Sequence, residues 1–188
     1  MTSGTAPTNG YRSRVYLAGP EVFLPNALEL GDKKKRICSE YGFDGVFPLD
    51  QTLSQQGLSK TEAAFAIADI CVDLMDGCDL GIANMTPFRS VSMDVGTAIE
   101  LGYMAAAGTL VFGYTNVDDH YMVRVAASGS DDGYEVEDFD LCDNLMCEGV
   151  IRRSGGEVVR HAAKPSDLFT DMTGFEACVR KAAELLAG

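Results

Sequence analysis

The sequence predicts one doubly wound α/β domain, in which helices cover both faces of a mainly parallel five-stranded sheet in a three-layer arrangement. Three observations predict it. The chain has 188 residues, enough for a single domain with a substantial core. Short apolar segments alternate with longer amphipathic ones along almost the whole chain. Strands that alternate with helices in this way are joined by right-handed crossovers, which makes the strands parallel.

The first part of the domain is predicted to contain two strands separated by a helix. Residues 14–19, RVYLAG, have the β-branched and aromatic content of a short buried strand. Residues 26–41 fit a helix whose basic run, KKKR, gives it a solvated stretch. Residues 44–50, DGVFPLD, predict a second strand closed by its proline. Residues 1–12 are polar, and we expect them to be a flexible lead-in to a domain of residues 13–188.

The second helix has a clear start signal. Over residues 59–77, Ser59 can cap the helix and Glu62 stands three residues later, as in a capping box. The apolar stripe of this helix consists of Ala63, Ile67, Ile70 and Leu74. Residues 78–85, CDLGIANM, and residues 109–116, TLVFGYTN, predict the third and fourth strands, with another helix between them.

The last part of the chain is harder to interpret. A short helix is predicted over residues 121–127, followed by an acidic loop over residues 128–140, and the segment 141–149, LCDNLMCEG, receives neither a helix nor a strand. Residues 157–161, EVVRH, predict a fifth strand, and residues 166–187 close the chain as an amphipathic helix. Five parallel strands wound in this order predict a flavodoxin-like architecture.

The fold class also predicts where a ligand would bind. In doubly wound sheets, ligands lie beyond the carboxyl ends of the strands. Three segments should therefore converge at one edge: AGPEVF after the first strand, NMTPFRSVSMD after the third and YTN after the fourth. The helix that starts near Val95 begins at the same edge.

Composition excludes several classes of partner. The net charge is −13 and the fifteen basic residues are scattered, which argues against nucleic acids and anionic membranes as partners. No apolar run approaches the roughly 20 residues that a membrane span needs, and the N-terminus lacks the apolar core of a secretory signal. We expect a soluble protein that binds a small uncharged ligand.

The cysteines indicate the compartment. None of the six forms a C-x-x-C motif, and only two histidines could join them, so a metal site is not expected. Free, buried thiols in a reducing cytoplasm are the better interpretation.

Common nucleotide and hydrolase motifs are missing. LAGPEVF follows the first strand in place of G-x-G-x-x-G, and the chain has no G-x-x-x-x-G-K-[ST] loop and no G-x-S-x-G elbow. Dinucleotide and nucleoside-triphosphate chemistry are therefore not expected, whereas a nucleoside site fits the sequence.

One carboxylate stands out because of its surroundings. Between Val95 and Val111, Glu100 is the only charged side chain. Gly96, one turn earlier on the same face, leaves open space through which a small molecule could reach it. A buried carboxylate needs hydrogen-bond donors, and Tyr16 in the first strand is a candidate.

Structural interpretations compete with the functional ones. Asp94 directly precedes the helix, where an aspartate usually acts as the N-cap. Glu100 could simply face solvent, although Gly96, Tyr103 and its other neighbours do not make a solvated face. Tyr16 could be an ordinary core tyrosine.

Four segments of the chain resemble the nucleoside 2-deoxyribosyltransferases. They are VYLAGPEVF, CDLGIANMTPFR, MDVGTAIELGYMAA and DNLM, which occur in the family's order over most of residues 14–150. The element D-x-G-T-x-x-E-L-G is the most specific of them. The resemblance implies transfer of a 2-deoxyribosyl group between nucleobases by double displacement, without a metal or cofactor, with a deoxynucleoside and a free nucleobase as the binding partners.

The resemblance also implies roles for particular residues. The family's nucleophilic glutamate falls on Glu100, which would form a covalent deoxyribosyl ester with net retention at the anomeric carbon. The tyrosine that orients it falls on Tyr16, and the aspartate that holds sugar hydroxyls falls on Asp94. Together with Gly96, the loop after the first strand would form the substrate site through Ala18, Gly19, Val22 and Phe23.

A homo-oligomer with shared active sites is a further implication. In relatives, a neighbouring subunit supplies an asparagine, which matches Asn144 in DNLM, with Met146 beside it. For Met146, as for any apolar residue, simple packing is the competing interpretation.

The chain departs from the family at one position. Some members carry an aspartate on the helix before the third strand, and this aspartate protonates the leaving base. Cys71 falls there, between Asp69 and Asp73. A thiol with an ordinary pKa near 8.5 is a poor general acid at neutral pH, so the base preference does not follow from the resemblance.

Two other functions compete with base transfer. A hydrolase would use water in place of the acceptor base. Related hydrolases of deoxynucleoside monophosphates carry a Gly/Ser/Arg-rich first loop, and AGPEVF lacks it, which favours a nucleoside substrate. A non-catalytic nucleoside-binding module on the same fold is the third possibility.

Overall fold

The computed structural model describes residues 12–51, 56–129 and 133–187. Its five strands form one parallel sheet in the order β2-β1-β3-β4-β5, so the predicted doubly wound, flavodoxin-like architecture is confirmed. The strands are β1 (Arg14–Ala18), β2 (Asp44–Val46), β3 (Leu80–Asn84), β4 (Leu110–Thr115) and β5 (Val158–Arg160). The proposed lead-in, residues 1–12, lies outside the described residues except for Arg12.

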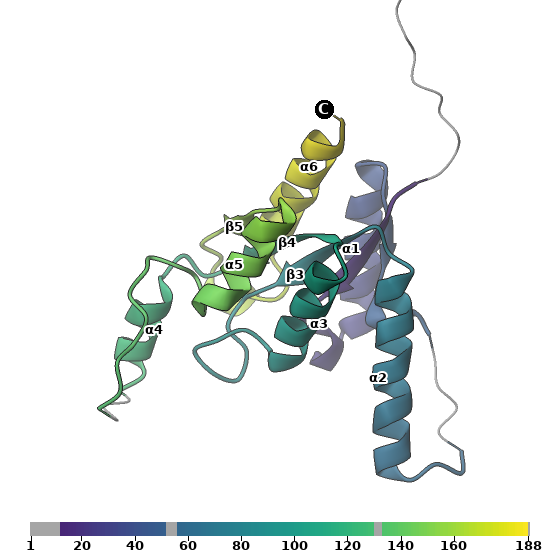
Figure 1. Cartoon of the computed structure of the whole chain (residues 1–188), viewed down its shortest axis with the longest axis horizontal. Coiled ribbons are helices and arrows are strands. Elements are labelled where there is room, and N and C mark those ends of the chain that lie inside the picture. The colour runs from purple at the N-terminus through teal and green to yellow at the C-terminus, as the bar shows by residue number, and fades with distance from the viewer. Residues whose placement is uncertain (1–11, 52–55, 130–132, 188) are drawn as a thin grey trace, which may run out of the picture.

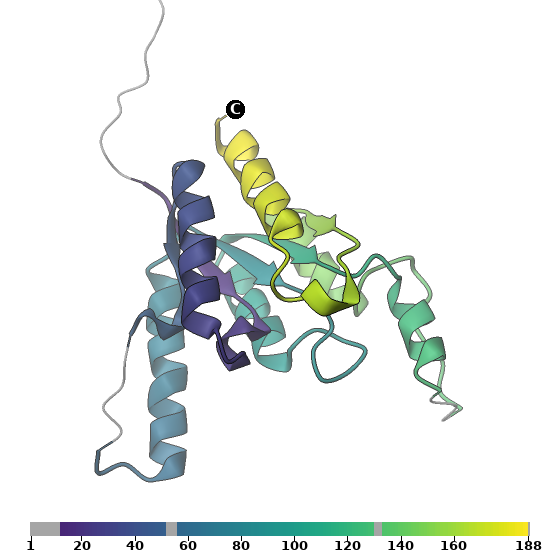
Figure 2. The same ribbon diagram turned by 180° about the vertical axis from the view of Figure 1, so that it is seen from behind.

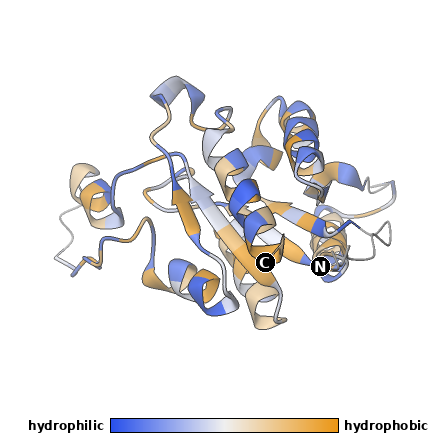
Figure 3. Ribbon diagram, turned by 90° about the horizontal axis from the view of Figure 1, so that it is seen from above, coloured by the Kyte–Doolittle hydropathy of each residue, from blue (hydrophilic) through white to orange (hydrophobic). Residues whose placement is uncertain are grey.

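Helices cover both faces of the sheet (Figures 1 and 2). On one face lie α1 (Ala27–Glu40) and α6 (Thr173–Ala187), and on the other lie α2 (Lys60–Asp76), α3 (Val95–Ala106) and α5 (Leu145–Ser154). Alternate residues of β1 point to the two sides, so Val15 and Leu17 join one core while Tyr16 and Ala18 join the other. Figure 3 shows the resulting apolar centre of the sheet.

Helix α2 has the predicted start and only part of the predicted buried face. Ser59 accepts a hydrogen bond from the Glu62 backbone, and the Glu62 carboxylate accepts one from the Ser59 backbone, so the capping box is confirmed. Ala63 and Leu74 are buried, but Ile67 is 45% exposed. The N-terminal half of α2 projects away from the sheet (Figure 1), which leaves this side chain without a covering layer.

In the C-terminal part, one helix was not predicted and the start of another was predicted wrongly. Residues 145–154 form helix α5, where no helix was predicted, after a short α4 (Tyr121–Ala127). The final helix begins at Thr173, not at residue 166, because the Asp171 side chain accepts a hydrogen bond from the Thr173 backbone there. A short 3-10 turn, η3 (Pro165–Asp167), precedes it.

Other features of the fold bear on the sequence predictions. All six cysteines are free thiols. Asp79, directly before β3, accepts a hydrogen bond from the Arg14 backbone. Among the described residues, no helix is long and apolar enough to cross a membrane.

Candidate active site

A cavity of about 260 Å³ opens at the carboxyl edge of the sheet, beside the ends of β1 and β2. Its residues come from four segments: the 3-10 turn η1 (Pro20–Phe23) with the glycine before it, the 3-10 turn η2 (Pro48–Asp50), α2, and the start of α3. They are Gly19, Val22, Phe23, Pro48, Leu49, Ile67, Cys71, Asp94, Gly96, Thr97 and Glu100. The volume lies just below the range for small-molecule sites, roughly 300–1,000 Å³.

Glu100 lies in this cavity against a buried tyrosine. The Tyr16 hydroxyl donates a hydrogen bond of 2.7 Å to Glu100 Oε1. Tyr16 is fully buried at the centre of β1, where the pleat directs its side chain toward α3. The sheet therefore fixes one carboxylate oxygen, and the second oxygen is left for other partners.

Burial changes the acidity of this carboxyl. Desolvation raises the pKa of Glu100 to about 7, the Tyr16 hydrogen bond opposes the rise, and the nearby Asp94 charge adds to it. The pKa of Tyr16 is raised far above its usual value by burial and by the Glu100 charge, so Tyr16 remains a neutral donor. The site thus holds a desolvated carboxyl group that is about half ionised at pH 7.

Asp94 caps α3 and also lines the cavity. Its Oδ2 accepts hydrogen bonds from the Thr97 backbone at 3.0 Å and from Thr97 Oγ1 at 3.2 Å. The N-cap interpretation is therefore correct, and it does not exclude contact with a ligand. A Cβ atom at Gly96 would lie 3.0 Å from Asp94 Oδ2, so a side chain there would crowd this carboxylate.

Cys71 faces the cavity one helical turn after Ile67. It interacts with the Tyr16 hydroxyl and lies within the field of Glu100. Burial raises the pKa of the thiol, the Glu100 charge raises it further, and the Tyr16 hydrogen bond opposes both. The thiol is therefore a weaker acid than an exposed cysteine.

A buried ion pair anchors the turn that carries Val22 and Phe23. Between Gly19 and Val22 in sequence, the Glu21 side chain is fully buried and forms an ion pair with Lys34 of α1. Lys34 is itself buried, so the prediction that the whole KKKR run is solvated was wrong at this residue. Glu21 Oε1 also accepts hydrogen bonds from Asn84 Nδ2 at 2.8 Å and from the Tyr114 hydroxyl at 2.9 Å. Residues from α1, β3 and β4 thus hold η1 in place.

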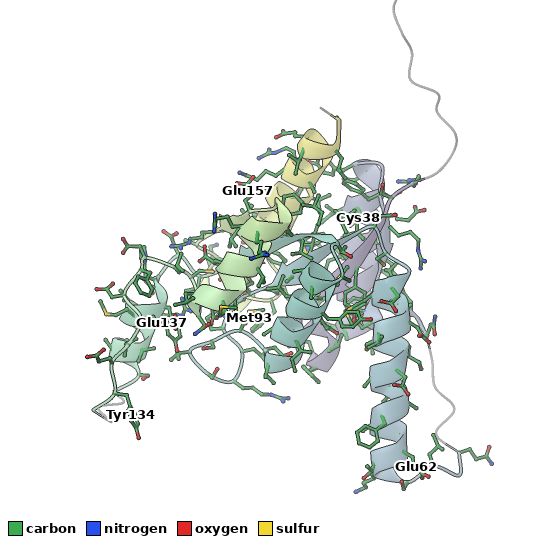
Figure 4. The ribbon with its side chains drawn as sticks, viewed as in Figure 1. Cys38, Glu62, Met93, Tyr134, Glu137 and Glu157 are labelled. Carbon is green, nitrogen blue, oxygen red and sulfur yellow. The ribbon has the colours of Figure 1, made fainter. Side chains whose placement is uncertain are left out.

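Several predicted site residues lie outside the cavity within one chain. Ala18 is buried in β1, and the segment after β4, expected at the ligand edge, does not line the cavity. Asn144 caps α5, and its Nδ2 donates to Glu137 Oε1 at 2.7 Å. The neighbouring Asp143 accepts a hydrogen bond from the Met93 backbone. Glu137 and Met93 are labelled in Figure 4. Met146 is 61% exposed on α5.

Sequence reasoning missed four residues of the cavity: Pro48, Leu49, Ile67 and Thr97. A signal existed for the first two, because they directly follow β2, which neighbours β1 in the sheet. The position of Ile67 depends on how far α2 extends beyond the sheet, which its apolar stripe does not indicate.

Comparison with known protein families gives a match over most of the chain. The family model for nucleoside 2-deoxyribosyltransferases matches residues 15–146, which include every residue that lines the cavity. The chain belongs to this family.

Three similar proteins were found, one by sequence and two among solved structures. An uncharacterised Schizosaccharomyces pombe protein, C191.05c, is 41% identical over 170 residues, which cover 77% of this chain and 79% of that protein. The 2-desoxiribosyltransferase of Leishmania mexicana matches with a TM-score of 0.67 and 29% identity, covering 92% of this chain and 97% of that one. A conserved Enterococcus faecalis protein has a TM-score of 0.56, 17% identity, and coverage of 92% and 99%, and shares the fold.

Proposed function

We propose that this protein transfers a 2-deoxyribosyl group from one nucleobase to another through a covalent ester on Glu100. The observation that carries the proposal is the hydrogen bond from the buried Tyr16 hydroxyl to Glu100 inside the cavity. It holds one oxygen of the carboxylate and leaves Oε2 to attack. Burial also raises the free energy of the ionised carboxylate, which makes it a better nucleophile than a solvated one.

The proposed reaction has two displacements. In the first, Glu100 Oε2 forms a bond to the anomeric carbon of the deoxynucleoside, the bond to the base nitrogen breaks, and its electron pair leaves with the base. In the second, a nitrogen of another base attacks the same carbon, gives up its proton to water and releases the carboxylate. Two inversions give net retention, as in retaining glycosidases. Neither step requires a metal or a cofactor.

The remaining cavity residues have places in this scheme. Asp94 uses Oδ2 to cap α3, and we assign its Oδ1 to accept a hydrogen bond from a sugar hydroxyl. Val22, Phe23 and Leu49 give the base an apolar surface, since they line the cavity without offering a charge. Gly96 leaves room for the ligand beside Asp94, whereas Gly19 leaves room for the buried Glu21 carboxylate, which a Cβ atom there would meet at 2.1 Å.

Base exchange separates this function from its rivals. Incubation of the protein with deoxyinosine and free adenine is expected to yield deoxyadenosine and hypoxanthine. Chromatography separates and quantifies these products. Without adenine, release of hypoxanthine and free deoxyribose at a comparable rate would identify a hydrolase. No turnover under either condition would identify a binding module and contradict the proposal.

We further propose a homo-oligomer in which Asn144 completes the site of a neighbouring subunit. Within one chain Asn144 does not line the cavity. Its position is fixed by hydrogen bonds from its backbone to Asp143 and from its side chain to Glu137. Large apolar side chains are exposed on the adjacent helices α3 and α5: Val95 at 74%, Ile99 at 68% and Met146 at 61%. An exposed apolar surface of this kind is typical of a protein interface.

Mixed oligomers test the shared site. Chains carrying Glu100→Ala and chains carrying Asn144→Ser are each expected to be nearly inactive, and serine retains the capping of α5. When the two are co-expressed, a random two-fold dimer should recover about a quarter of wild-type activity, because half of the dimers are mixed and each mixed dimer has one intact site. Base exchange per chain measures the recovery, and no recovery on mixing would contradict sharing.

A further inference from the structure

The cavity has one wall that is almost free of ionisable groups. Residues from η1, η2 and α2 form it: Val22, Phe23, Pro48, Leu49, Ile67 and Cys71. The Cys71 thiol is the only titratable side chain among these six. The residues from the start of α3 carry the two carboxylates, Asp94 and Glu100. The apolar wall suits a flat base, whereas the polar side suits the sugar.

Among the described residues of this chain, none that lines the cavity is suited to protonate a departing base. Glu100 cannot serve, because it is the proposed nucleophile and must be ionised to attack. Asp94 accepts two hydrogen bonds from Thr97 at the N-terminus of α3, a position that needs an acceptor. Burial and the Glu100 charge both raise the pKa of Cys71, so its thiol donates a proton less readily than an exposed one.

We propose that this site expels the base without a side-chain acid and therefore selects donors whose base leaves as a stable anion. The inference rests on the proposed function. As the bond from the anomeric carbon to Glu100 forms, the bond to the base breaks and its electron pair stays on the base nitrogen. The base takes a proton from water after departure. Deoxyuridine and its 5-halogenated derivatives should be better donors than deoxycytidine, because cytosine is the weaker acid. Cys71 is the residue that sets this selectivity.

A series of donor nucleosides measures how the rate of base release depends on the acidity of the base. Deoxyuridines with hydrogen, methyl, fluorine or bromine at position 5 are compared at one adenine concentration, and kcat/KM for the donor is plotted against the pKa of the free base. In a double displacement, this constant reports the first step alone. For the wild type we expect kcat/KM to fall roughly tenfold for each unit by which the base pKa rises.

Two variants assign the effect to position 71. In Cys71→Asp, burial and the neighbouring Glu100 charge raise the pKa of the new carboxyl, which keeps its proton and supplies an acid. The slope of kcat/KM against base pKa should then become shallower. The kcat/KM for deoxycytidine should rise by a larger factor than that for deoxyuridine. Cys71→Ser has nearly the same size and no useful acidity, so it should keep the wild-type slope.

The outcomes separate this inference from the proposed function. Base exchange that is independent of base acidity in the wild type would overturn the inference and leave the function intact. A steep wild-type series that stays equally steep in folded Cys71→Asp would overturn the assignment to Cys71. If Cys71→Asp does not fold, the wild-type and Cys71→Ser series still decide whether an acid acts. No release of base from any donor would overturn both.

Discussion

Glu100→Gln is expected to lower base exchange by about 10⁴-fold or more, because an amide cannot form the ester on which both displacements depend. The variant keeps the shape of the side chain and an oxygen that accepts the Tyr16 hydrogen bond. Loss of activity would therefore reflect lost nucleophilicity and not a rearranged cavity. Chromatographic assay of deoxyinosine with adenine gives the rate, and activity near that of the wild type would exclude Glu100 as the nucleophile.

The same variant should be more stable than the wild type above pH 7. The pKa of Glu100 is raised from 4.5 to about 7 in the folded protein, so the native state holds this proton more tightly than the unfolded chain does. The contribution of this bound proton to the stability of the folded wild type is fully present below pH 4.5 and is lost as the pH rises through 7. Glutamine has no proton to lose, and its advantage reaches at most about 3 kcal/mol in the free energy of unfolding.

Urea denaturation at pH 5 and pH 8 measures this difference, which should be larger at pH 8. Glu184→Gln is the matched control, because Glu184 is exposed on α6 and should change neither stability nor activity. Wild-type kcat/KM should also fall below pH 7, as the nucleophile becomes protonated. Equal stability of wild type and Glu100→Gln at both pH values would mean that Glu100 is not desolvated.

The sheet could be predicted from the sequence because buried parallel strands are continuous apolar runs, as in CDLGIANM. Helix α5 could not. Its residues include Gly149 and the β-branched Val150 and Ile151, which are poor helix formers, and the helix is stabilised by packing against α3 and β4. A local sequence pattern predicts helices and strands whose own residues favour that structure. It misses elements that are stabilised by contacts with residues distant in sequence.

The same distinction between local pattern and distant contacts applies to the site. The isolation of Glu100 and the glycine one turn before it are visible in a few consecutive residues. The burial of Glu21 is not, because a glutamate in AGPEVF looks like an exposed turn residue. Its environment is made by Lys34, Asn84 and Tyr114, which only the folded chain brings together.

Lys34→Met is expected to lower the free energy of unfolding by about 3–5 kcal/mol, since it leaves the Glu21 carboxylate buried without its counter-ion. Both side chains of the pair are about 1% exposed. The Lys34 ammonium also lies 5.3 Å from the centre of the Tyr114 ring and 5.1 Å from that of Phe175, so no water replaces it easily. Urea denaturation measures the loss.

Two further variants separate charge from packing. Lys33→Met, at an exposed position next in sequence, should change stability by no more than about 0.5 kcal/mol. Glu21→Gln combined with Lys34→Met removes both charges while glutamine still accepts from Asn84 and Tyr114, so most of the stability should return. Since Glu21 precedes Val22 and Phe23, the double variant should retain the fold but bind the base less tightly, with a raised KM and a smaller change in kcat. A double variant as unstable as Lys34→Met alone would show that the lysine acts through packing and not through its charge.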